Sequence, residues 1–537
     1  MNAQPQHGPL PQTTPEQIRH ALRSGTETAL LDLREEGAFA TGHPLFAVNL
    51  PLGRIEERIA DLIPRKTTPI VLYDNGENRV AAALSTLQRL GYTQVTLLSG
   101  GLEGWIASGG EIFIDVNVPS KAFGELVEHV RHTPSLPAQE VHARLERGDD
   151  LVILDARRFV EYTVMSIPQG RSVPGAELAL RVQDIAPSPS TTVIVNCAGR
   201  TRSIIGTQSL INANIPNPVY ALRNGTIGWT LAGFDLEHGA TRTPPESSAT
   251  HHALARERAQ HLAERAGVRT VTTQQLTTLI NRDEHTTYLL DVRSPEEYAA
   301  DHLSDFRSAP GGQLVQATDE WVGVRHATLI LTDTDGVRAR MTAHWLRQLG
   351  WQETYVLDDW TGLDHATGFP PPRLAAPLPE TATLSPADLA VALASDSPPL
   401  LLDLDISPNF KKNHIDGSFF IIPTDIFSSP QVHKAEQIVL TSSDGVAAHS
   451  AAVRLSTTHP GTIHVLAGGT AAWQAAGYPL VSGFSNTNAL SEPVDVYKRP
   501  YEGTDNAGAA MQAYLDWEFG LVAQLERDGT HGFQVLE

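Results

Sequence analysis

Four stretches of the chain repeat one order of apolar and polar positions. In each stretch, an amphipathic segment that starts at a cap or turn residue is followed by an apolar run that ends in aspartate. The amphipathic segments begin near Thr14, Pro137, Thr272 and Ser385. The apolar runs end at Asp32, Asp155, Asp291 and Asp403. Strand-like runs that alternate with helix-like segments predict an α/β fold with a mainly parallel sheet in every repeat.

A second apolar run in each repeat ends at a nearly fixed distance from this aspartate. The residues at its end, here called the loop positions, are Asp74, Cys197, Asp333 and Ser442. They follow the aspartate by 42 residues in three repeats and by 39 in the fourth. Tryptophans expected to pack in the core come 31 or 32 residues later, as Trp105, Trp229 and Trp473. This agreement indicates internal duplication.

The repeats predict the domain organisation. The expected bounds are 10–118, 134–240, 268–373 and 381–483, followed by a C-terminal helical tail, 484–537. Further helices are expected at 121–131 and 249–266, between repeats. Residues 511–527 of the tail carry a wide apolar face on an expected helix. That face predicts packing onto a neighbouring repeat, with a homodimer contact as the alternative.

Composition narrows the functional classes. The net charge of −21 and the pI near 5.4 argue against nucleic acids and anionic membrane surfaces as partners. No apolar run approaches the roughly 20 residues of a membrane span, and residues 1–15 do not read as a secretory leader. The single cysteine excludes intrachain disulfides and predicts a reducing, cytoplasmic setting. The 21 histidines form no metal-binding pattern, so neither a metal nor a cofactor is expected.

That cysteine lies in an unusual environment. A lone cysteine is ordinarily a small buried apolar residue. Here an apolar strand ends at Cys197, and a loop leads directly into an apolar helical stretch. The loop residues are Ala198, Gly199, Arg200, Thr201, Arg202 and Ser203. A strand–loop–helix of this kind aims backbone N–H groups at the loop centre, and two arginines add donors suited to small oxyanions, so the loop favours a reactive thiolate.

The segment from Cys197 to Ser203 resembles the active-site loop of the rhodanese sulfurtransferases. The resemblance implies four tandem rhodanese-like domains, each a small mainly parallel sheet flanked by helices. It implies that Cys197 accepts a sulfane sulfur as a persulfide and passes it on, with the residues from Ala198 to Ser203 as the substrate cradle. Only repeat 2 has a thiol at the loop position, so repeats 1, 3 and 4 are expected to be inactive.

The expected reaction is sulfur transfer from a small anionic donor to cyanide or a thiol. Thiosulfate is the leading donor because two arginines suit a small dianion, with mercaptopyruvate and glutathione persulfide as alternatives. Arg202 and the loop amides are expected to stabilise the thiolate and the persulfide, and Arg200 to orient the donor at the mouth. A non-catalytic sulfur carrier or scaffold is a second hypothesis. A phosphatase of the Cdc25 kind is a third, although that family's loop is one residue longer.

The recurring aspartates are assigned structural roles because they also occur in repeats without the thiol. An arginine follows two residues later in three repeats, as Arg34, Arg157 and Arg293. These arginines are expected to pair with nearby carboxylates, and Arg157 is also a candidate for the rim of the site.

Overall fold

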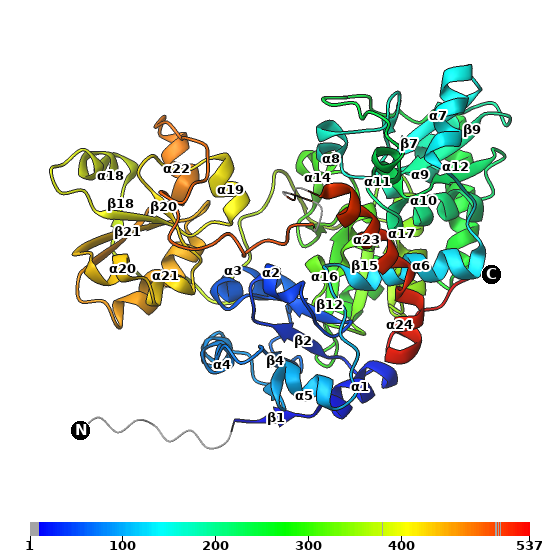
Figure 1. Ribbon diagram of the computed structural model, residues 1–537. Coiled ribbons are helices and arrows are strands. Elements are labelled where there is room, and N and C mark those ends of the chain that lie inside the picture. Colours follow the sequence, from blue (N-terminus) through cyan, green and yellow to red (C-terminus); the bar gives the residue numbers. More distant parts are fainter. Residues whose placement is uncertain (1–9, 379, 500–501, 503, 505, 537) are drawn as a thin grey trace.

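The computed structural model describes residues 10–378, 380–499, 502, 504 and 506–536, and these residues form four five-stranded sheets (Figure 1). All strand pairs within these sheets are parallel. The α/β fold class with four tandem domains is therefore confirmed. Residues 1–9, which hold most of the polar N-terminal segment, lie outside the described residues.

Repeats 1 and 2 have the same element order. The strands of repeat 1 are β1 (Gln12–Thr13), β2 (Ala29–Asp32), β3 (Ala47–Asn49), β4 (Ile70–Tyr73) and β5 (Val95–Leu98). Its helices are α1 (Pro15–Ser24), α2 (Glu36–Phe39), η1 (Leu52–Arg54), α3 (Ile55–Leu62), α4 (Val80–Arg89) and α5 (Gly101–Ala107). The strands of repeat 2 are β6 (Ser135–Leu136), β7 (Leu151–Asp155), β8 (Arg171–Ser172), β9 (Thr192–Asn196) and β10 (Val219–Leu222). Its helices are α7 (Ala138–Arg147), α8 (Phe159–Val164), η2 (Gly175–Glu177), α9 (Leu178–Ile185), α10 (Thr201–Asn212) and α11 (Gly225–Leu231).

Repeats 3 and 4 follow the same plan. The strands of repeat 3 are β11 (Arg269–Val271), β12 (Thr287–Asp291), β14 (Arg307–Ser308), β15 (Thr328–Thr332) and β16 (Thr354–Leu357), with a small ribbon of β13 (His302–Leu303) and β17 (His365–Ala366). Its helices are α13 (Thr273–Ile280), α14 (Pro295–Ala300), α15 (Gly311–Gln316), α16 (Thr318–Trp321) and α17 (Arg338–Gln348). The strands of repeat 4 are β18 (Thr383–Leu384), β19 (Leu400–Asp403), β20 (Phe419–Phe420), β21 (Gln437–Thr441) and β22 (Thr462–Leu466). Its helices are α18 (Pro386–Leu393), α19 (Ser407–Lys412), η3 (Asp425–Phe427), α20 (Pro430–Lys434), α21 (Val446–Ser456) and α22 (Gly469–Ala475).

One strand order recurs in all four sheets, and in repeat 2 it is β6-β10-β9-β7-β8. The strand that leads to the loop position is therefore central in every repeat. Side-chain caps set the helix starts: the hydroxyls of Thr14, Thr272 and Ser385 accept the first-turn amides of α1, α13 and α18. The predicted helix starts at these positions are confirmed.

In three repeats the recurring aspartate pairs with the arginine two residues later, as expected. In repeat 2, Arg157 Nε and Nη2 donate to the Asp155 carboxylate at 2.9 and 2.7 Å, and both residues are 1% exposed. Equivalent pairs join Asp32 to Arg34 and Asp291 to Arg293. Repeat 4 has Asp405 in place of this arginine. Burial, reinforced by the charge of Asp405, raises the pKa of Asp403 to about 7.

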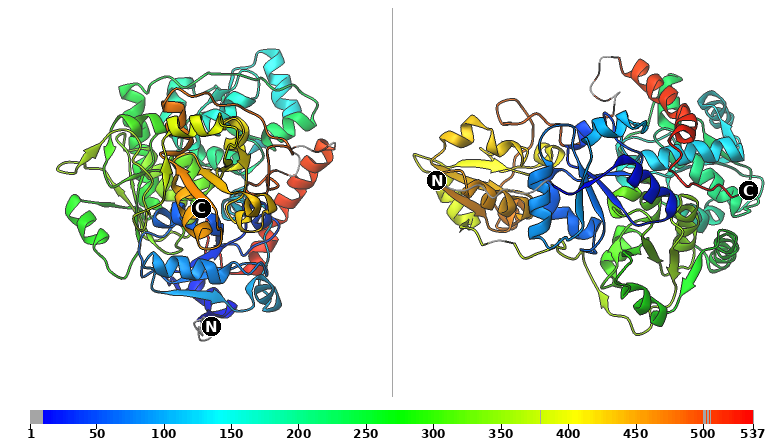
Figure 2. Two further views of the ribbon diagram at one scale, coloured as in Figure 1. Left: turned by 90° about the vertical axis from the view of Figure 1, so that its left-hand side faces the viewer. Right: turned by 90° about the horizontal axis from the view of Figure 1, so that it is seen from below.

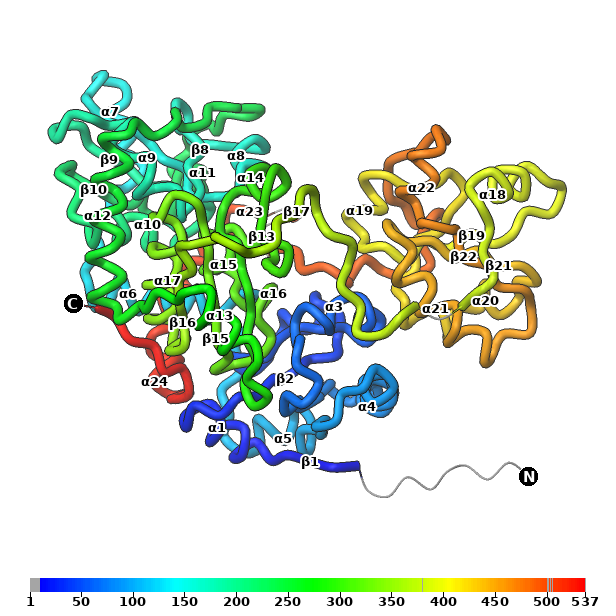
Figure 3. Tube along the Cα trace, turned by 180° about the vertical axis from the view of Figure 1, so that it is seen from behind, coloured from blue at the N-terminus to red at the C-terminus, as the bar shows by residue number. Residues whose placement is uncertain are grey.

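The repeats associate in two pairs through one equivalent segment, the turn that follows the third strand of each. In the pair of repeats 2 and 3, η2 packs on α15, and Gly175 approaches Gly312 so closely that a Cβ at Gly175 would lie 3.5 Å from the Gly312 Cα. In the pair of repeats 1 and 4, a Cβ at Gly53 would lie 2.7 Å from the Pro423 Cβ. Repeat 4 has hydrophobic clusters of its own and stands to one side, next to repeat 1 (Figures 1 and 3).

Segments outside the repeats bind them together. The inter-repeat helices α6 (Val118–Arg131) and α12 (Ala249–Arg265) form where the sequence predicted helices. The tail contains α23 (Ala507–Phe519) and α24 (Leu521–Asp528), where one continuous helix was expected; the break lies at Gly520, whose amide donates to the Trp517 carbonyl. Both tail helices pack on α6 (Figure 2), and Leu521 and Leu525 join a core that also contains residues of repeats 1 and 3. The predicted packing of the tail onto its neighbours is confirmed.

Candidate active site

Cys197 follows β9 at the carboxyl end of the central strand and is 2% exposed. Its Sγ lies 3.5 Å from the Ser203 Oγ, and the Ser203 hydroxyl donates to the Arg200 carbonyl at 2.7 Å. Helix α11 closes the other side, where the Thr226 amide donates to the Cys197 carbonyl at 2.9 Å. Gly225 begins this helix with φ 56°, and a Cβ there would lie 2.3 Å from the Cys197 carbonyl oxygen. Only glycine fits so close to the loop.

The backbone amides of residues 198–203, which follow the thiol in the loop, donate to no acceptor in the part of the chain that the structure describes. Helix α10 starts at Thr201, so its N-terminal end adds a favourable dipole for a negative charge at the loop centre. The loop therefore has the form of an anion cradle with a sulfur atom inside it.

In repeats 1 and 3 an aspartate at the loop position accepts hydrogen bonds from the amides of its own loop. In repeat 1 the Asp74 carboxylate accepts the amides of Gly76 and Arg79 at 3.0 and 2.7 Å. In repeat 3 the Asp333 carboxylate accepts the amides of Gly336 and Ala339 at 2.8 and 2.7 Å. In both repeats the carboxyl group at the loop position accepts the hydrogen bonds of the loop amides. In repeat 2 a thiol takes this place, and the equivalent amides stay available.

Arg202 lies beside the thiol in an ion pair with α8. Its Nη1 and Nη2 donate to the two Glu161 oxygens at 2.8 and 2.9 Å. Burial opposes both charges, but the pairing prevails: it raises the pKa of Arg202 and lowers that of Glu161. Arg202 Nε donates to no acceptor among the described residues.

Arg200 borders the same cavity, but its guanidinium is turned toward α6. Nε and Nη2 donate to the Glu125 carboxylate at 2.7 and 2.8 Å, and Nη2 also contacts Glu128. Nη1 donates to the Asn224 side chain at 3.1 Å, and the whole residue is 4% exposed. The structure thus shows an anchor that ties the loop to α6. An orienting role toward a donor at the mouth stays a prediction.

A cavity of about 440 Å³ opens at Cys197, and its walls come from repeats 1, 2 and 3, from α6 and from the tail. Repeat 2 contributes the loop residues from Cys197 to Arg202 together with Arg157, Arg158 and Glu161. The surrounding parts contribute Lys121 from α6, Gln313 and Gln316 from α15, and Tyr514 and Glu518 from α23. Arg157 is thus at the wall as well as in its structural ion pair. Of the expected cradle, Cys197 to Arg202 line the cavity, and Ser203 lies behind the thiol.

The sequence analysis did not identify Glu161 or the residues from α6, α15 and α23. Glu161 had a detectable signal: Glu297 takes the same place in repeat 3, six residues after the aspartate, and pairs there with Arg338. The others come from segments that no repeat pattern connects with Cys197.

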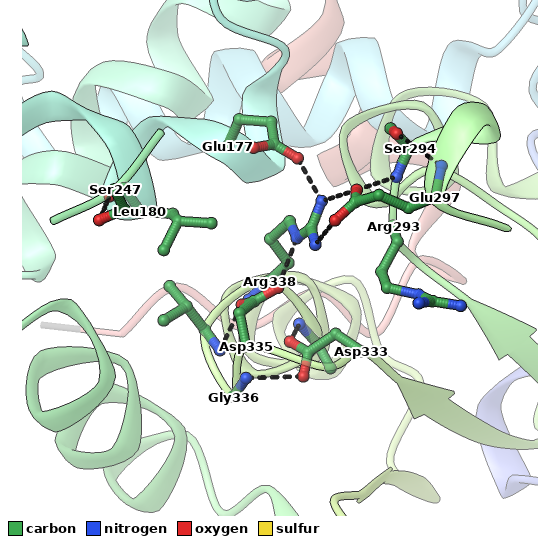
Figure 4. Close-up of polar contacts among 12 residues, drawn as sticks. Glu177, Leu180, Ser247, Arg293, Ser294, Glu297, Asp333, Asp335, Gly336 and Arg338 are labelled. Carbon is green, nitrogen blue, oxygen red and sulfur yellow. Dashed lines mark hydrogen bonds and ion pairs between the residues drawn. The ribbon is translucent and has the colours of Figure 1, made fainter. Parts of the chain in front are cut away.

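A network of ion pairs occupies the loop of repeat 3 (Figure 4). Arg338 holds the place of Arg202, and its guanidinium contacts Glu297 at 2.5 Å, Asp335 at 2.6 Å and, across the domain interface, Glu177 at 2.6 Å. Burial and the neighbouring Asp335 raise the pKa of Asp333 to about 7. In repeat 4 the loop has Ser442, 2% exposed, and Ala447 replaces the arginine. Neither loop combines a thiol with open donors.

The described residues hold no group of three or more His, Cys, Asp or Glu side chains placed to bind a metal ion. None of their helices is both long and apolar enough to cross a lipid bilayer. The site therefore consists of a thiol, backbone amides, arginines and carboxylic acids.

Comparison with known proteins agrees with this geometry. The model of the rhodanese-like domain matches residues 14–108, 137–232, 272–359 and 385–476. This chain belongs to the rhodanese family. Each match contains four strands of one sheet and one loop position, so the family assignment holds for all four repeats.

Individual rhodanese relatives add detail. A crystal structure of a thiosulfate sulfurtransferase from Pseudomonas aeruginosa is 52% identical, covers 98% of this chain and 100% of its own, and superposes with a TM-score of 0.94. The thiosulfate sulfurtransferase PspE of Escherichia coli is 33% identical over 73 residues, which are 14% of this chain and 69% of PspE. The uncharacterised protein YqhL of Bacillus subtilis is 34% identical over 99 residues, 18% of this chain and 72% of YqhL.

Proposed function

We propose that this chain is a thiosulfate sulfurtransferase that works through a persulfide on Cys197. The observation that carries the proposal is the difference between the loop of repeat 2 and the loops of repeats 1 and 3 in what their backbone amides bind. The amides that bind a carboxylate in repeats 1 and 3 are open around Cys197 in repeat 2. The similarity to the Pseudomonas aeruginosa thiosulfate sulfurtransferase over nearly the whole chain supports the choice of donor.

The chemistry takes two displacements. The Cys197 thiolate attacks the outer sulfur of thiosulfate, the sulfur–sulfur bond to the sulfonate breaks, and its electron pair leaves with sulfite. The persulfide anion stays on Cys197, where the amides of residues 198–203 and the Arg202 charge stabilise it. A cyanide carbon or a thiolate then attacks the outer sulfur, and the bond to Cys197 breaks to return the thiolate. The proposal includes a reducing, cytoplasmic setting because thiol acceptors are kept reduced there.

The intact mass of the purified protein tests this function. Incubation with thiosulfate should add the mass of one sulfur atom, and cyanide should then remove it with formation of an equal amount of thiocyanate. Cys197→Ala should show neither change.

Other results would redirect the assignment. Loading by mercaptopyruvate or glutathione persulfide but not by thiosulfate would contradict the proposed donor. A persulfide that forms but never turns over would favour a sulfur carrier. Hydrolysis of an aryl phosphate that depends on Cys197 would favour a phosphatase.

We also predict that donor use weakens at alkaline pH because of Glu518. This residue lies on α23, is 1% exposed and lines the Cys197 cavity, and a Cβ at Gly199 would lie 3.5 Å from its Oε2. Burial and the charge of Glu125 raise the pKa of Glu518 to about 8, against the opposing charges of Lys121 and Arg200. Below pH 8 the side chain is neutral and admits a dianion; above it, a carboxylate repels thiosulfate. The KM for thiosulfate should rise about three- to tenfold between pH 7 and 9.

Glu518→Gln should remove this alkaline rise because the amide cannot ionise. Asp516→Asn is the matched control, since Asp516 is an exposed carboxylate on the same helix and its loss should leave the pH profile unchanged. An unaltered alkaline rise in Glu518→Gln would show that another group controls it.

A further inference from the structure

The pairing of repeats 2 and 3 places equivalent residues of each repeat at the loop of the other. Glu177, at the end of η2, lies 22 residues after Asp155, and Gln313, in α15, lies 22 residues after Asp291. Glu177 reaches across the interface to the Arg338 Nη1 at 2.6 Å (Figure 4). Gln313 correspondingly lines the cavity of Cys197 and Arg202. The two loops therefore receive different chemical groups from the same place in the fold.

At a second equivalent position, repeat 3 again has a carboxylate beside its arginine and repeat 2 has none. Asp335, two residues after the loop position of repeat 3, accepts a hydrogen bond from the Arg338 Nε at 2.6 Å. The equivalent residue of repeat 2 is Gly199, which has no side chain. Arg338 thus has three carboxylate partners in the described structure, Glu177, Glu297 and Asp335, whereas Arg202 has Glu161 alone. The guanidinium of the active loop therefore pairs with one carboxylate where that of repeat 3 pairs with three, and its Nε donates to no acceptor among the described residues.

The Gln313 side chain also lacks a hydrogen-bond acceptor among the described residues. Its Nε2 is enclosed and donates to no acceptor among the described residues. A buried amide donor without an acceptor costs free energy unless a ligand or water satisfies it. In a cavity that contains a thiol, open loop amides and an arginine, the missing acceptor fits an anionic oxygen.

We propose that Gln313, supplied by repeat 3, is a specificity-determining residue of the Cys197 site, where its neutral carboxamide donates to the sulfonate of the bound donor and leaves Arg202 open to that anion. A glutamate in this place would close the loop as Glu177 closes that of repeat 3. This inference rests on the proposed function. It names Gln313 as the residue through which repeat 3, which has no thiol at its loop position, selects the donor of the Cys197 site.

The test compares Gln313→Glu, Gln313→Ala and Glu177→Gln in the full-length protein, by steady-state kinetics with thiosulfate and cyanide. Gln313→Glu should raise the KM for thiosulfate by more than about tenfold, with a smaller change in kcat, because a new carboxylate pairs with Arg202 and repels the dianion. Gln313→Ala should raise it only about three- to tenfold, through loss of one donor. Glu177→Gln, the matched change at the equivalent position, should leave the KM unchanged.

Protonation gives a readout that a purely structural role would not move. The KM of Gln313→Glu should fall back toward the wild-type value as the pH is lowered and the new carboxylate becomes neutral, whereas Gln313→Ala should show no such recovery. If Gln313→Glu folds poorly, Gln313→Met carries the test: it is uncharged, close in size and has no donor, and its KM must rise.

Sulfur loading of the wild type separates the two hypotheses. Absence of loading by thiosulfate would contradict the proposed function itself. Normal loading of the wild type together with a wild-type KM in Gln313→Glu would overturn only the role of Gln313. Equal losses in Gln313→Glu and Gln313→Ala at every pH would likewise overturn it, because they would reflect packing and not charge.

Discussion

Replacing Cys197 by serine should abolish sulfur transfer and leave the fold intact. A serine oxygen cannot hold a sulfane sulfur as a persulfide, and an alcohol is a far weaker nucleophile than a thiolate. We expect kcat/KM for thiosulfate to fall by about 10⁴-fold or more, the scale on which loss of a covalent nucleophile acts in other enzymes. The measurement is thiocyanate formation at saturating cyanide, with thermal unfolding of the same sample as the folding check.

The chain contains natural precedents for this substitution. Ser442 occupies the loop position of repeat 4 and Asp74 that of repeat 1, and both repeats form the complete five-stranded sheet. A serine at position 197 is therefore compatible with the loop. Residual transfer well above the uncatalysed rate in Cys197→Ser would mean that sulfur travels through another group, and the persulfide mechanism would fail.

Arg202→Ala should cause the second-largest loss, about 10³-fold in kcat/KM for thiosulfate. Two effects act in the same direction. The substitution removes the cation beside the thiol, and it leaves the Glu161 carboxylate without the bidentate partner that now holds it at 2.8 and 2.9 Å. A half-buried carboxylate that keeps only the weaker contacts to Arg158 and Arg499 repels a dianionic donor and an anionic persulfide.

A double variant separates these effects. Arg202→Ala combined with Glu161→Gln should recover about tenfold of the lost activity, because the repelling charge disappears while the cation stays absent. Arg79→Ala, the equivalent change in the loop of repeat 1, should leave activity at the wild-type level and serves as the matched control. No recovery in the double variant would show that the cation alone accounts for the loss.

Much of the fold could be read from the chain because duplication repeats its signals. Thr14, Thr272 and Ser385 predicted three helix starts, and the runs that end at Asp32, Asp155, Asp291 and Asp403 predicted the second strand of each sheet. These features depend on local capping and on burial of short apolar segments, which neighbouring residues determine. The single helix expected in the tail was wrong: the helix breaks at Gly520, and both parts pack on α6, a contact that the local pattern does not show.

Less of the site than of the fold could be predicted from local sequence patterns. The cradle from Cys197 to Ser203 is contiguous in sequence, so its composition revealed it. Its surroundings are not contiguous: Glu125 comes from a helix between repeats, Gln313 from the next repeat and Glu518 from the tail. No spacing rule connects these residues, because they meet only through the packing of whole domains. Arg200 illustrates the consequence, since the carboxylates on α6 that engage it are more than 70 residues away in sequence.

In the sequence, the pair of repeats 2 and 3 lies between the two members of the other pair, repeats 1 and 4. This arrangement affects the order in which the interfaces can form during synthesis. Repeats 2 and 3 are consecutive, so their interface at Gly175 and Gly312 can form while the rest of the chain is still being made. Repeat 1 is made before the other three repeats, whereas Pro423, which packs on Gly53, belongs to repeat 4. The face of η1 and α3 that packs on α21 therefore stays uncovered until repeat 4 has been made, and it is open to misassociation until then.

The wall that α23 contributes to the Cys197 cavity comes later still, because α23 begins only at Ala507. A chain in which α23 has not yet been made holds the Cys197 loop without this wall, so its thiol lies in a more open pocket. Enclosure of the sulfur atom therefore depends on a segment that belongs to none of the four repeats.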